Sequence, residues 1–321
     1  MTTPAPPSAR TRATHRAFGV TWAIPFDFPP YARIDDAVGT DADVVIVEEP
    51  VPPAAADAIW AGPLRAVTGS AITYGMPDEG RMRITDGNRI GFERLDGCTD
   101  EALRLLLMGP GAALILHQRG RLPLHGSGIV IDTPDGPAAI LLVGHSGAGK
   151  STTLGAFMDL GYPVLCDDLA AVDLDEDGRA VVYPGTQVMK VWSDSAQSLG
   201  WQTDGLPRVR PELEKFIVPL REQGSDAVPL VAIYQIVLHN EPDVVLTEKS
   251  SAAKFNALLD HTWQKMTVKR MGLHRQHFEH IVAVANQVRV VQVKRPDGVP
   301  ITDHDLVDRI IADFSSHEPR A

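Results

Sequence analysis

Eight consecutive residues, Gly144–Ser151, fit the pattern GxxxxGK[ST] and carry the clearest chemistry in this chain. Glycines in such a loop let the backbone direct several amides at one phosphate. Lys150 can reach the β- and γ-phosphates as a compact cation, and the Ser151 hydroxyl can ligate Mg²⁺. The pattern therefore predicts a site for a nucleoside di- or triphosphate. The expected binding residues are Gly144, His145, Ser146, Gly147, Ala148, Gly149, Lys150, Ser151 and Thr152.

The residues on either side of this loop have the periodicity that such a site requires. Ala138–Val143 is a short apolar run that predicts a buried strand, and Ser151–Leu160 predicts a helix whose N-terminus favours anions. A glycine-rich turn without a ligand is the alternative. The order strand, loop and helix favours phosphate binding over that alternative.

Two acidic residues and one histidine could supply the rest of phosphoryl transfer, which needs a group that takes the proton of the acceptor. Asp167 and Asp168 follow a buried strand predicted at Pro163–Cys166, so we expect them to emerge beside the loop. One carboxylate could hold Mg²⁺ while the other faces the acceptor hydroxyl, and a solvated turn is the alternative. His125 is predicted at the start of a hairpin strand beside the loop, where a merely packed histidine is the alternative.

In their order along the chain, these elements resemble the catalytic domain of HPr serine kinase/phosphorylase. That family carries a histidine–glycine pair before its P-loop and an aspartate pair after it, as here in Leu124-His125-Gly126 and Cys166-Asp167-Asp168. The resemblance covers roughly residues 118–240. It implies a kinase domain that uses ATP and Mg²⁺.

The resemblance also implies a role for each candidate residue. Asp168 would accept the proton of the acceptor hydroxyl, and His125 would hold or tune that aspartate. Lys150 would bind the phosphates, while Ser151 and Asp167 would lie near Mg²⁺. The expected catalytic set is therefore Asp168, His125 and Lys150, and the expected metal ligands are Ser151 and Asp167.

One segment departs from the bifunctional enzymes of that family. They carry a metal-binding glutamate in a signature segment, whereas the corresponding residues 181–186 contain no acid here. This difference argues against phosphorylase activity and against HPr as substrate. The whole chain is more similar to HPr-kinase-like proteins that accompany ribosomally made peptide clusters, including lasso-peptide clusters, in the blocks 184–192 and 208–215. That similarity implies phosphorylation of a serine hydroxyl on a peptide, a protein or a small molecule, with a ribosomal peptide precursor as one acceptor.

Two clusters of titratable residues outside these motifs could bind ligands. The segment Arg208–Lys215 concentrates positive charge in an acidic protein and would suit a phosphate or an acidic peptide, although a solvated loop explains it equally well. The segment His274–His280 places three histidines at helical spacing. Without a Cys or carboxylate at ligand spacing, they predict a polar helix face rather than a metal site.

The chain of 321 residues is predicted to hold a tail and two domains. Residues 1–17 are expected to be disordered because they are rich in Pro, Thr, Ala and Arg. Residues 18–98 are predicted to form a β-rich N-terminal domain, and residues 99–321 the HPr-kinase-like P-loop catalytic domain. The fold class is therefore α/β, with a mixed-sheet P-loop kinase domain of HPr-kinase type preceded by a smaller β-rich domain.

Local signals within these domains predict particular elements. Arg81–Glu93 is expected to form a hairpin around an Asp-Gly turn, and a second hairpin is expected from residues 124–132 and 138–143. A helix capped by Thr99 is expected to be interrupted at Gly109–Gly111 and to resume beyond it.

The composition is that of a globular protein, with 44% apolar and 22% charged residues. A formal net charge of −11 argues against binding to nucleic acid or to an anionic membrane surface. The sequence has no apolar run of membrane-spanning length and no signal peptide, and Cys98 and Cys166 are expected to be reduced thiols. These features predict a cytoplasmic protein without nucleic-acid or membrane partners, and a homo-oligomer is compatible with the sequence.

Two other functions are open at this point. The chain could be a nucleotide-binding regulatory or scaffold module that transfers no phosphate, or an NTP hydrolase that drives a conformational change. Neither an LSGGQ transporter signature nor an NKxD guanine motif occurs in the sequence. The presence of His125, Asp167 and Asp168 in addition to Lys150 favours phosphoryl transfer over binding alone.

Overall fold

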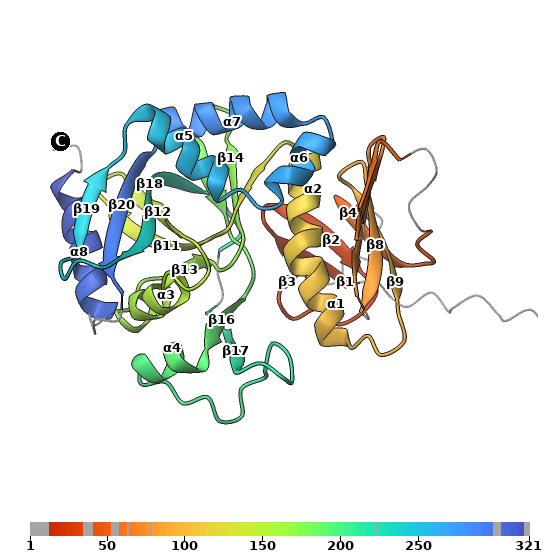
Figure 1. Cartoon of the computed structure of the whole chain (residues 1–321), viewed down its shortest axis with the longest axis horizontal. Coiled ribbons are helices and arrows are strands. Elements are labelled where there is room, and N and C mark those ends of the chain that lie inside the picture. Colours follow the sequence, from red (N-terminus) through yellow and green to blue (C-terminus); the bar gives the residue numbers. More distant parts are fainter. Residues whose placement is uncertain are drawn as a thin grey trace, which may run out of the picture.

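The computed structural model describes residues 13–34, 41–52, 58–62, 64–77, 79–221, 224–297 and 303–317. These residues form two large sheets, one separate two-stranded sheet, and helices that lie between the sheets and on their faces (Figure 1). The predicted α/β fold, with a mixed sheet around the P-loop and a β-rich part before it, is confirmed.

The first sheet contains nine strands in the described part of the chain. They are β1 (Ala13–Ala17), β2 (Val20–Ile24), β3 (Ala32–Ile34), β4 (Val44–Glu48), β5 (Trp60–Ala61), β6 (Arg65–Thr68), β7 (Ala71–Met76), β8 (Gly80–Thr85) and β9 (Arg89–Arg94). Their order is β3-β1-β2-β4-β9-β8-β7-β6-β5, and only β2–β4 and β4–β9 are parallel pairs. β8 and β9 form the predicted hairpin, closed by positive φ angles at Asp86 (53°) and Gly87 (66°).

The predicted disordered tail overlaps the first strand, and for those residues the prediction is wrong. Ala13–Ala17 pair with β2 along their whole length, from Ala13 opposite Ile24 to Ala17 opposite Val20. Thr14, His15 and Ala17 are buried, so packing against the sheet outweighs the composition of this segment. Residues 1–12 lie outside the described residues.

The predicted interruption of the helix after Thr99 is also wrong. Helix α1 (Asp100–Leu106) continues through the π-helical turn η1 (Leu107–Gly111) into α2 (Ala112–Gln118). Thr99 does cap α1, since its side chain accepts a hydrogen bond from the Ala102 amide at 3.1 Å. Pro110 lacks an amide proton, and the wider π turn accommodates it without ending the helix.

This long helix belongs to the core of the first sheet. Leu103, Leu114 and Ile115 are fully or almost fully buried in one cluster with Ile84 and Phe92. In Figure 1 the helix stands between the first sheet and the rest of the molecule. The hydrophobic core of the first sheet therefore extends past residue 98, where the domain boundary was predicted, and the boundary itself stays a prediction.

The second sheet is mixed and also contains nine strands in the described residues. They are β10 (Leu122–Leu124), β11 (Gly126–Thr133), β12 (Gly136–Val143), β13 (Val164–Cys166), β14 (Ala170–Leu174), β15 (Ala180–Tyr183), β18 (Val228–His239), β19 (Val245–Glu248) and β20 (Arg289–Pro296). The order is β10-β14-β15-β18-β12-β11-β13, with β20 parallel to β18 and β19 paired to β20. β11 and β12 form the second predicted hairpin, and the strand expected from Leu124 divides at His125 because β10 pairs with β14 instead.

Six further helices follow along the described residues. They are α3 (Lys150–Asp159), α4 (Ser193–Ser198), α5 (Ser251–Asp260), α6 (Lys265–Arg270), α7 (His274–Gln287) and α8 (Asp303–Ser316). Alternate residues of β12 face opposite sides: Ile140 and Leu142 pack in one cluster with α3 and α8, whereas Leu141 and Val143 pack with α5 and α7. The strand that enters the P-loop is therefore buried on both faces.

The separate two-stranded sheet is the hairpin of β16 (Val188–Trp192) and β17 (Lys215–Pro219), which lies below the second sheet in Figure 1. One face is apolar, and there Val191 and Phe216 pack with Ala196 of α4. The segment before it contacts the first sheet, since the Phe18 amide donates to the Pro184 carbonyl at 2.7 Å. The first sheet therefore helps to fix the start of this hairpin.

Candidate active site

The P-loop has the backbone that its sequence predicts. Gly147 and Gly149 have φ angles of 83° and 97°, in the left-handed region that favours glycine. A Cβ on Gly144 would lie 2.6 Å from the carbonyl oxygen of Ile236, so only glycine fits between the loop and β18. The loop ends at the first turn of α3, where the free amides and the helix dipole favour binding of an anion. This cradle fits the phosphates of a nucleotide.

Lys150 lies folded against the loop, with its side chain almost fully buried. Its Nζ donates hydrogen bonds to the carbonyl oxygens of Gly144 at 2.8 Å and His145 at 3.2 Å. Burial lowers the pKa of Lys150, and the carboxylates of Asp168 and Asp167 oppose that effect. The lysine is therefore a cation held inside the loop, next to the aspartate pair.

Asp167 is the more buried of the two aspartates and is held on both oxygens. Its Oδ1 accepts from the Ser127 hydroxyl at 2.8 Å, and its Oδ2 accepts from the Lys190 amide at 2.9 Å. Burial and the neighbouring Asp168 raise the pKa of Asp167. Each oxygen retains a second lone pair, so a metal ligand at Asp167 is compatible with these bonds and stays a prediction.

Asp168 lies between two basic side chains. Its Oδ2 is 2.6 Å from the Lys190 ammonium, and its Oδ1 is 3.3 Å from Nδ1 of His125. Burial alone would raise the pKa of Asp168, but Lys190 and His125 lower it to about 2. Asp168 also has a φ of 69°, a conformation that costs free energy in a residue other than glycine. The chain is thus held in a strained turn that places this carboxylate beside the loop.

His125 contacts Asp168 through both the backbone and the side chain of the aspartate. Its Nδ1 lies 3.0 Å from the Asp168 carbonyl oxygen, and both of its partners there are acceptors, so we assign the proton to Nδ1. The indole of Trp263 packs edge-on against the imidazole and donates to the same carbonyl at 2.9 Å. Burial lowers the pKa of His125, which favours the neutral ring.

The predicted site residues therefore come together, although the strands that carry them are not adjacent in the sheet. β13 runs in the same direction as β12 but is separated from it by β11, which pairs antiparallel with both. Asp167 and Asp168 still emerge at the edge that bears the P-loop. His125 reaches them from the chain between β10 and β11.

Sequence reasoning missed Ser127 and Trp263, and it named the segments that contain Lys190 and Lys215 without placing either lysine at the aspartates. Lys190 pairs with Asp168, and Lys215 is close enough to affect its pKa. Ser127 and Trp263 hold the aspartates in place. The available signals for the two lysines were the resemblance in the blocks 184–192 and 208–215 and the positive charge of Arg208–Lys215, because Val188–Trp192 contains a single polar residue, Lys190, and shows no alternation.

Most side chains of the two titratable clusters have partners other than the aspartate pair. Arg208 pairs with Glu214 at 2.7 Å and Arg210 pairs with Glu79, so within Arg208–Lys215 it is Lys215 that faces the aspartates. His280 contacts the Gly120 carbonyl oxygen at 2.8 Å through Nδ1. No group of three or more metal-ligating side chains occurs within the described ranges.

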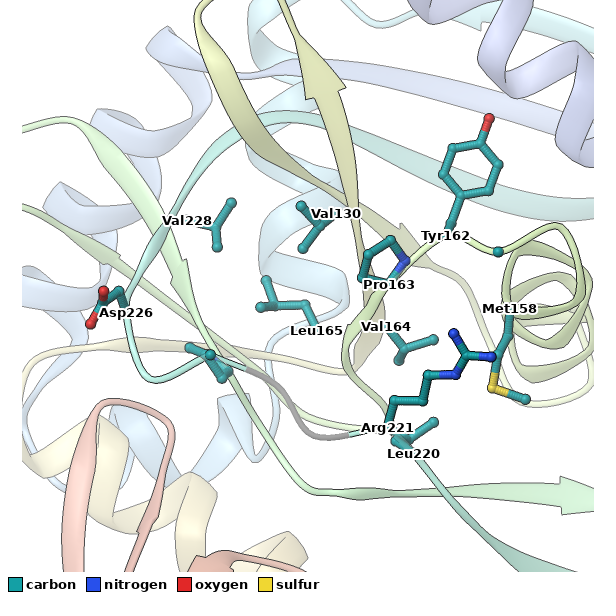
Figure 2. A pocket seen from close by; sticks show the side chains of 13 residues that line it. Val130, Met158, Tyr162, Pro163, Val164, Leu165, Leu220, Arg221, Asp226 and Val228 are labelled. Atoms are coloured by element: carbon teal, nitrogen blue, oxygen red, sulfur yellow. The ribbon is translucent and has the colours of Figure 1, made fainter. Parts of the chain in front are cut away.

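A cavity of about 320 Å³, lined mostly by apolar residues, lies elsewhere, at the start of β13 (Figure 2). Val130 and Val164 line it from the strands, and Met158 and Leu220 line it from α3 and the chain after β17. None of the predicted site residues borders this cavity. The chemistry is therefore concentrated at the opposite end of β13, where Asp167 follows the strand.

Comparison with known proteins agrees with the class that this loop defines. No family model matches the chain. The dephospho-CoA kinase of Escherichia coli K12 is 30% identical over 192 residues, covering 55% of this chain and 89% of that protein. The dephospho-CoA kinase of Salmonella paratyphi A is 28% identical with the same coverage. The solved HPr(Ser) kinase/phosphatase from Coxiella burnetii matches 60% of this chain and 96% of its own, with a TM-score of 0.30 and 11% identity, which by itself supports no conclusion.

The fold and the loop define a P-loop nucleotide-binding protein. Because the similarity to dephospho-CoA kinase extends over nearly all of that protein, the chain belongs to the P-loop kinases. Nucleotide binding and phosphoryl transfer are the functions of that class. Within the described residues, no helix has the length and apolar character needed to cross a membrane.

Proposed function

We propose that this protein is an ATP- and Mg²⁺-dependent kinase that phosphorylates a serine hydroxyl of a peptide or protein. The observation that carries the proposal is the position of Asp168, which lies within the electrostatic reach of Lys150 and is held by His125 and Lys190. A scaffold that only binds nucleotide would not need an ionised carboxylate in a strained turn beside the phosphate loop.

Each residue has a defined task in this reaction. Mg²⁺–ATP, when bound, supplies the phosphoryl group. The loop amides and Lys150 hold the phosphates, and Asp168 orients the acceptor hydroxyl and takes its proton. A carboxylate with a pKa of about 2 is a weak base, but the loose transition state of phosphoryl transfer requires little proton removal before the phosphoryl group moves. His125 orients Asp168 through two contacts and does not itself touch the proton.

Ser151 and Asp167 are the residues that would hold Mg²⁺. Ser151 lies in the first turn of α3, and Asp167 presents two carboxylate oxygens at the end of β13. Oxygen donors of this kind suit Mg²⁺, which keeps several of its own waters and so needs few protein ligands.

The serine acceptor rests on the resemblance to HPr-kinase-like proteins in the blocks 184–192 and 208–215. A ribosomal peptide precursor is the acceptor that this resemblance favours. From the composition and charge of the chain we also propose a cytoplasmic location without nucleic-acid or membrane partners, and a homo-oligomer is compatible with the sequence.

Dephospho-CoA is a second candidate acceptor. It is favoured by the identity of 30% to dephospho-CoA kinase. Because that similarity covers 55% of this chain, it leaves much of the chain without a counterpart in those enzymes.

One assay separates the two acceptors. The protein is incubated with Mg²⁺ and γ-labelled ATP, and the acceptors are a serine peptide library, the same library with alanine for serine, and dephospho-CoA. We expect label in the serine library and in neither control. Label in dephospho-CoA alone would replace the serine acceptor with the second candidate. Label in none of the three, with ATP bound tightly, would support the scaffold function instead.

A further inference from the structure

Three of the eight lysines in this chain converge on the aspartate pair. Lys150 approaches from the P-loop, whereas Lys190 and Lys215 approach from the β16–β17 hairpin. Each of the three interacts electrostatically with Asp168. The P-loop motif accounts for Lys150 alone, so the two hairpin lysines need a separate explanation.

The register of the hairpin places both lysines on one face. Lys190 is opposite Ile217, and Trp192 is opposite Lys215, so Lys190 and Lys215 are diagonal neighbours on the same side. The other side is the apolar face that packs on α4. Lys215 Nζ lies 5.2 Å from the centre of the Trp192 ring, and the Lys190 side chain is 12% exposed. The hairpin thus turns a cationic face towards the aspartates.

The charges in this cluster do not balance. Asp167 and Asp168 contribute two carboxylates, and the three lysines contribute three ammonium groups. Lys190 pairs with Asp168, but among the residues that the structure describes, no carboxylate forms an ion pair with Lys215. Burial and the Lys190 charge lower the pKa of Lys215, and the carboxylates of Asp168 and Asp167 oppose that effect. A partly buried cation of this kind favours an anion beside it.

We propose that Lys190 and Lys215 form a second phosphoryl-binding site opposite Lys150, which takes the terminal phosphoryl group of the bound nucleotide. The inference rests on the proposed kinase function. With a triphosphate bound, Lys190 shifts from Asp168 to the phosphoryl oxygens. Asp168 is then free to accept the hydrogen bond of the acceptor hydroxyl.

In the transfer step, the bond between the γ-phosphorus and the bridging oxygen of ADP breaks as the bond from the acceptor oxygen forms. The hydroxyl proton goes to Asp168, and Lys190 and Lys215 remain on the transferred phosphoryl group. With ADP, no γ-phosphoryl group competes for Lys190, so the Lys190–Asp168 pair persists. The base is therefore available only when there is a phosphoryl group to transfer.

The test compares the binding of two nucleotides in the full chain without an acceptor. Calorimetry with Mg²⁺ measures the affinity for ADP and for the non-hydrolysable β,γ-imido analogue of ATP. We expect Lys190→Gln and Lys215→Gln each to reduce the preference for the triphosphate by about tenfold, because each removes one charged hydrogen bond. Affinity for ADP should change by less than about threefold. Equal loss of both nucleotides would overturn the proposal.

A double variant excludes an indirect effect through Asp168. Removing Lys190 leaves the Asp168 carboxylate unneutralised, and that charge alone would repel a triphosphate. In Lys190→Gln/Asp168→Asn this charge is absent. A persistent loss of preference supports direct binding by Lys190, whereas full recovery would contradict it.

Two matched variants control for folding and for charge. Lys190→Arg keeps the cation and should retain most of the preference. Lys265→Gln removes an exposed lysine that pairs with Asp260 rather than with Asp167 or Asp168, and it should bind both nucleotides as the wild type does. The labelling assay tests the proposed kinase function separately. A lack of labelled serine peptide would contradict that function, but it would not change the measured ratio of the affinities for the triphosphate analogue and ADP.

Discussion

The two sides of the phosphate site are built in different ways. The P-loop side is one continuous segment, and its shape depends on backbone angles at Gly147 and Gly149. The opposite, assembled side is built from distant parts of the chain. Lys190 of the β16–β17 hairpin and Trp263, which follows α5, both contact Asp168 through tertiary packing. Nucleotide binding should therefore tolerate changes in tertiary packing better than phosphoryl transfer does.

The largest loss is expected from Lys150→Ala, which acts on the P-loop side. This change removes the cation that the loop holds for the β- and γ-phosphates, so we expect much weaker binding of Mg²⁺–ATP and no detectable transfer. Calorimetric titration measures the binding. Unchanged ATP affinity in this variant would mean that the loop is not the nucleotide site.

A smaller loss is expected from His125→Ala, which acts on the assembled side. His125 orients Asp168 but does not take the proton, so we expect the transfer rate to fall by roughly tenfold, at the low end for acid–base machinery. ATP affinity should remain within about threefold. A loss of ATP affinity with an unchanged transfer rate would place His125 on the nucleotide instead.

The smallest expected effect is on stability, and it comes from buried histidines on the assembled side. Burial lowers the pKa of His117 to about 3 and that of His261 to about 4, and His117 contacts the Trp263 carbonyl oxygen at 2.7 Å. Between pH 6.5 and 4 the unfolded chain therefore binds protons that the folded chain does not. The free energy of unfolding is highest above pH 6.5 and should fall by about 2 kcal/mol per histidine at pH 5.

Denaturant unfolding at pH 7.5 and pH 5.0 measures this difference. His117→Gln removes one titrating group, so it should reduce the pH dependence by about 2 kcal/mol whatever it does to stability at pH 7.5. An equal pH dependence in wild type and variant would show that His117 does not titrate between the two states.

The sequence predicts elements whose signals are local. The P-loop, the hairpin that precedes it and the aspartate pair each depend on a few neighbouring residues. Lys190 could not be placed, because its contact with Asp168 depends on a hairpin whose strands are separated by 22 residues, 193–214. The continuous helix through Pro110 was missed for a related reason. Tertiary burial of Leu107 and Met108 stabilises a π turn that the local Gly-Pro-Gly signal argues against.

The central claim is that Asp168 acts in the chemical step and not in holding nucleotide, and Asp168→Asn tests it most directly. Transfer to a serine peptide and affinity for Mg²⁺–ATP are measured for Asp167→Asn and Asp168→Asn side by side. We predict that Asp168→Asn lowers the transfer rate by roughly 10²–10⁴-fold while ATP affinity does not fall, because the amide keeps the shape but cannot take the proton. Asp167→Asn should instead weaken the Mg²⁺ dependence of binding. Wild-type transfer rates in both variants would contradict the account.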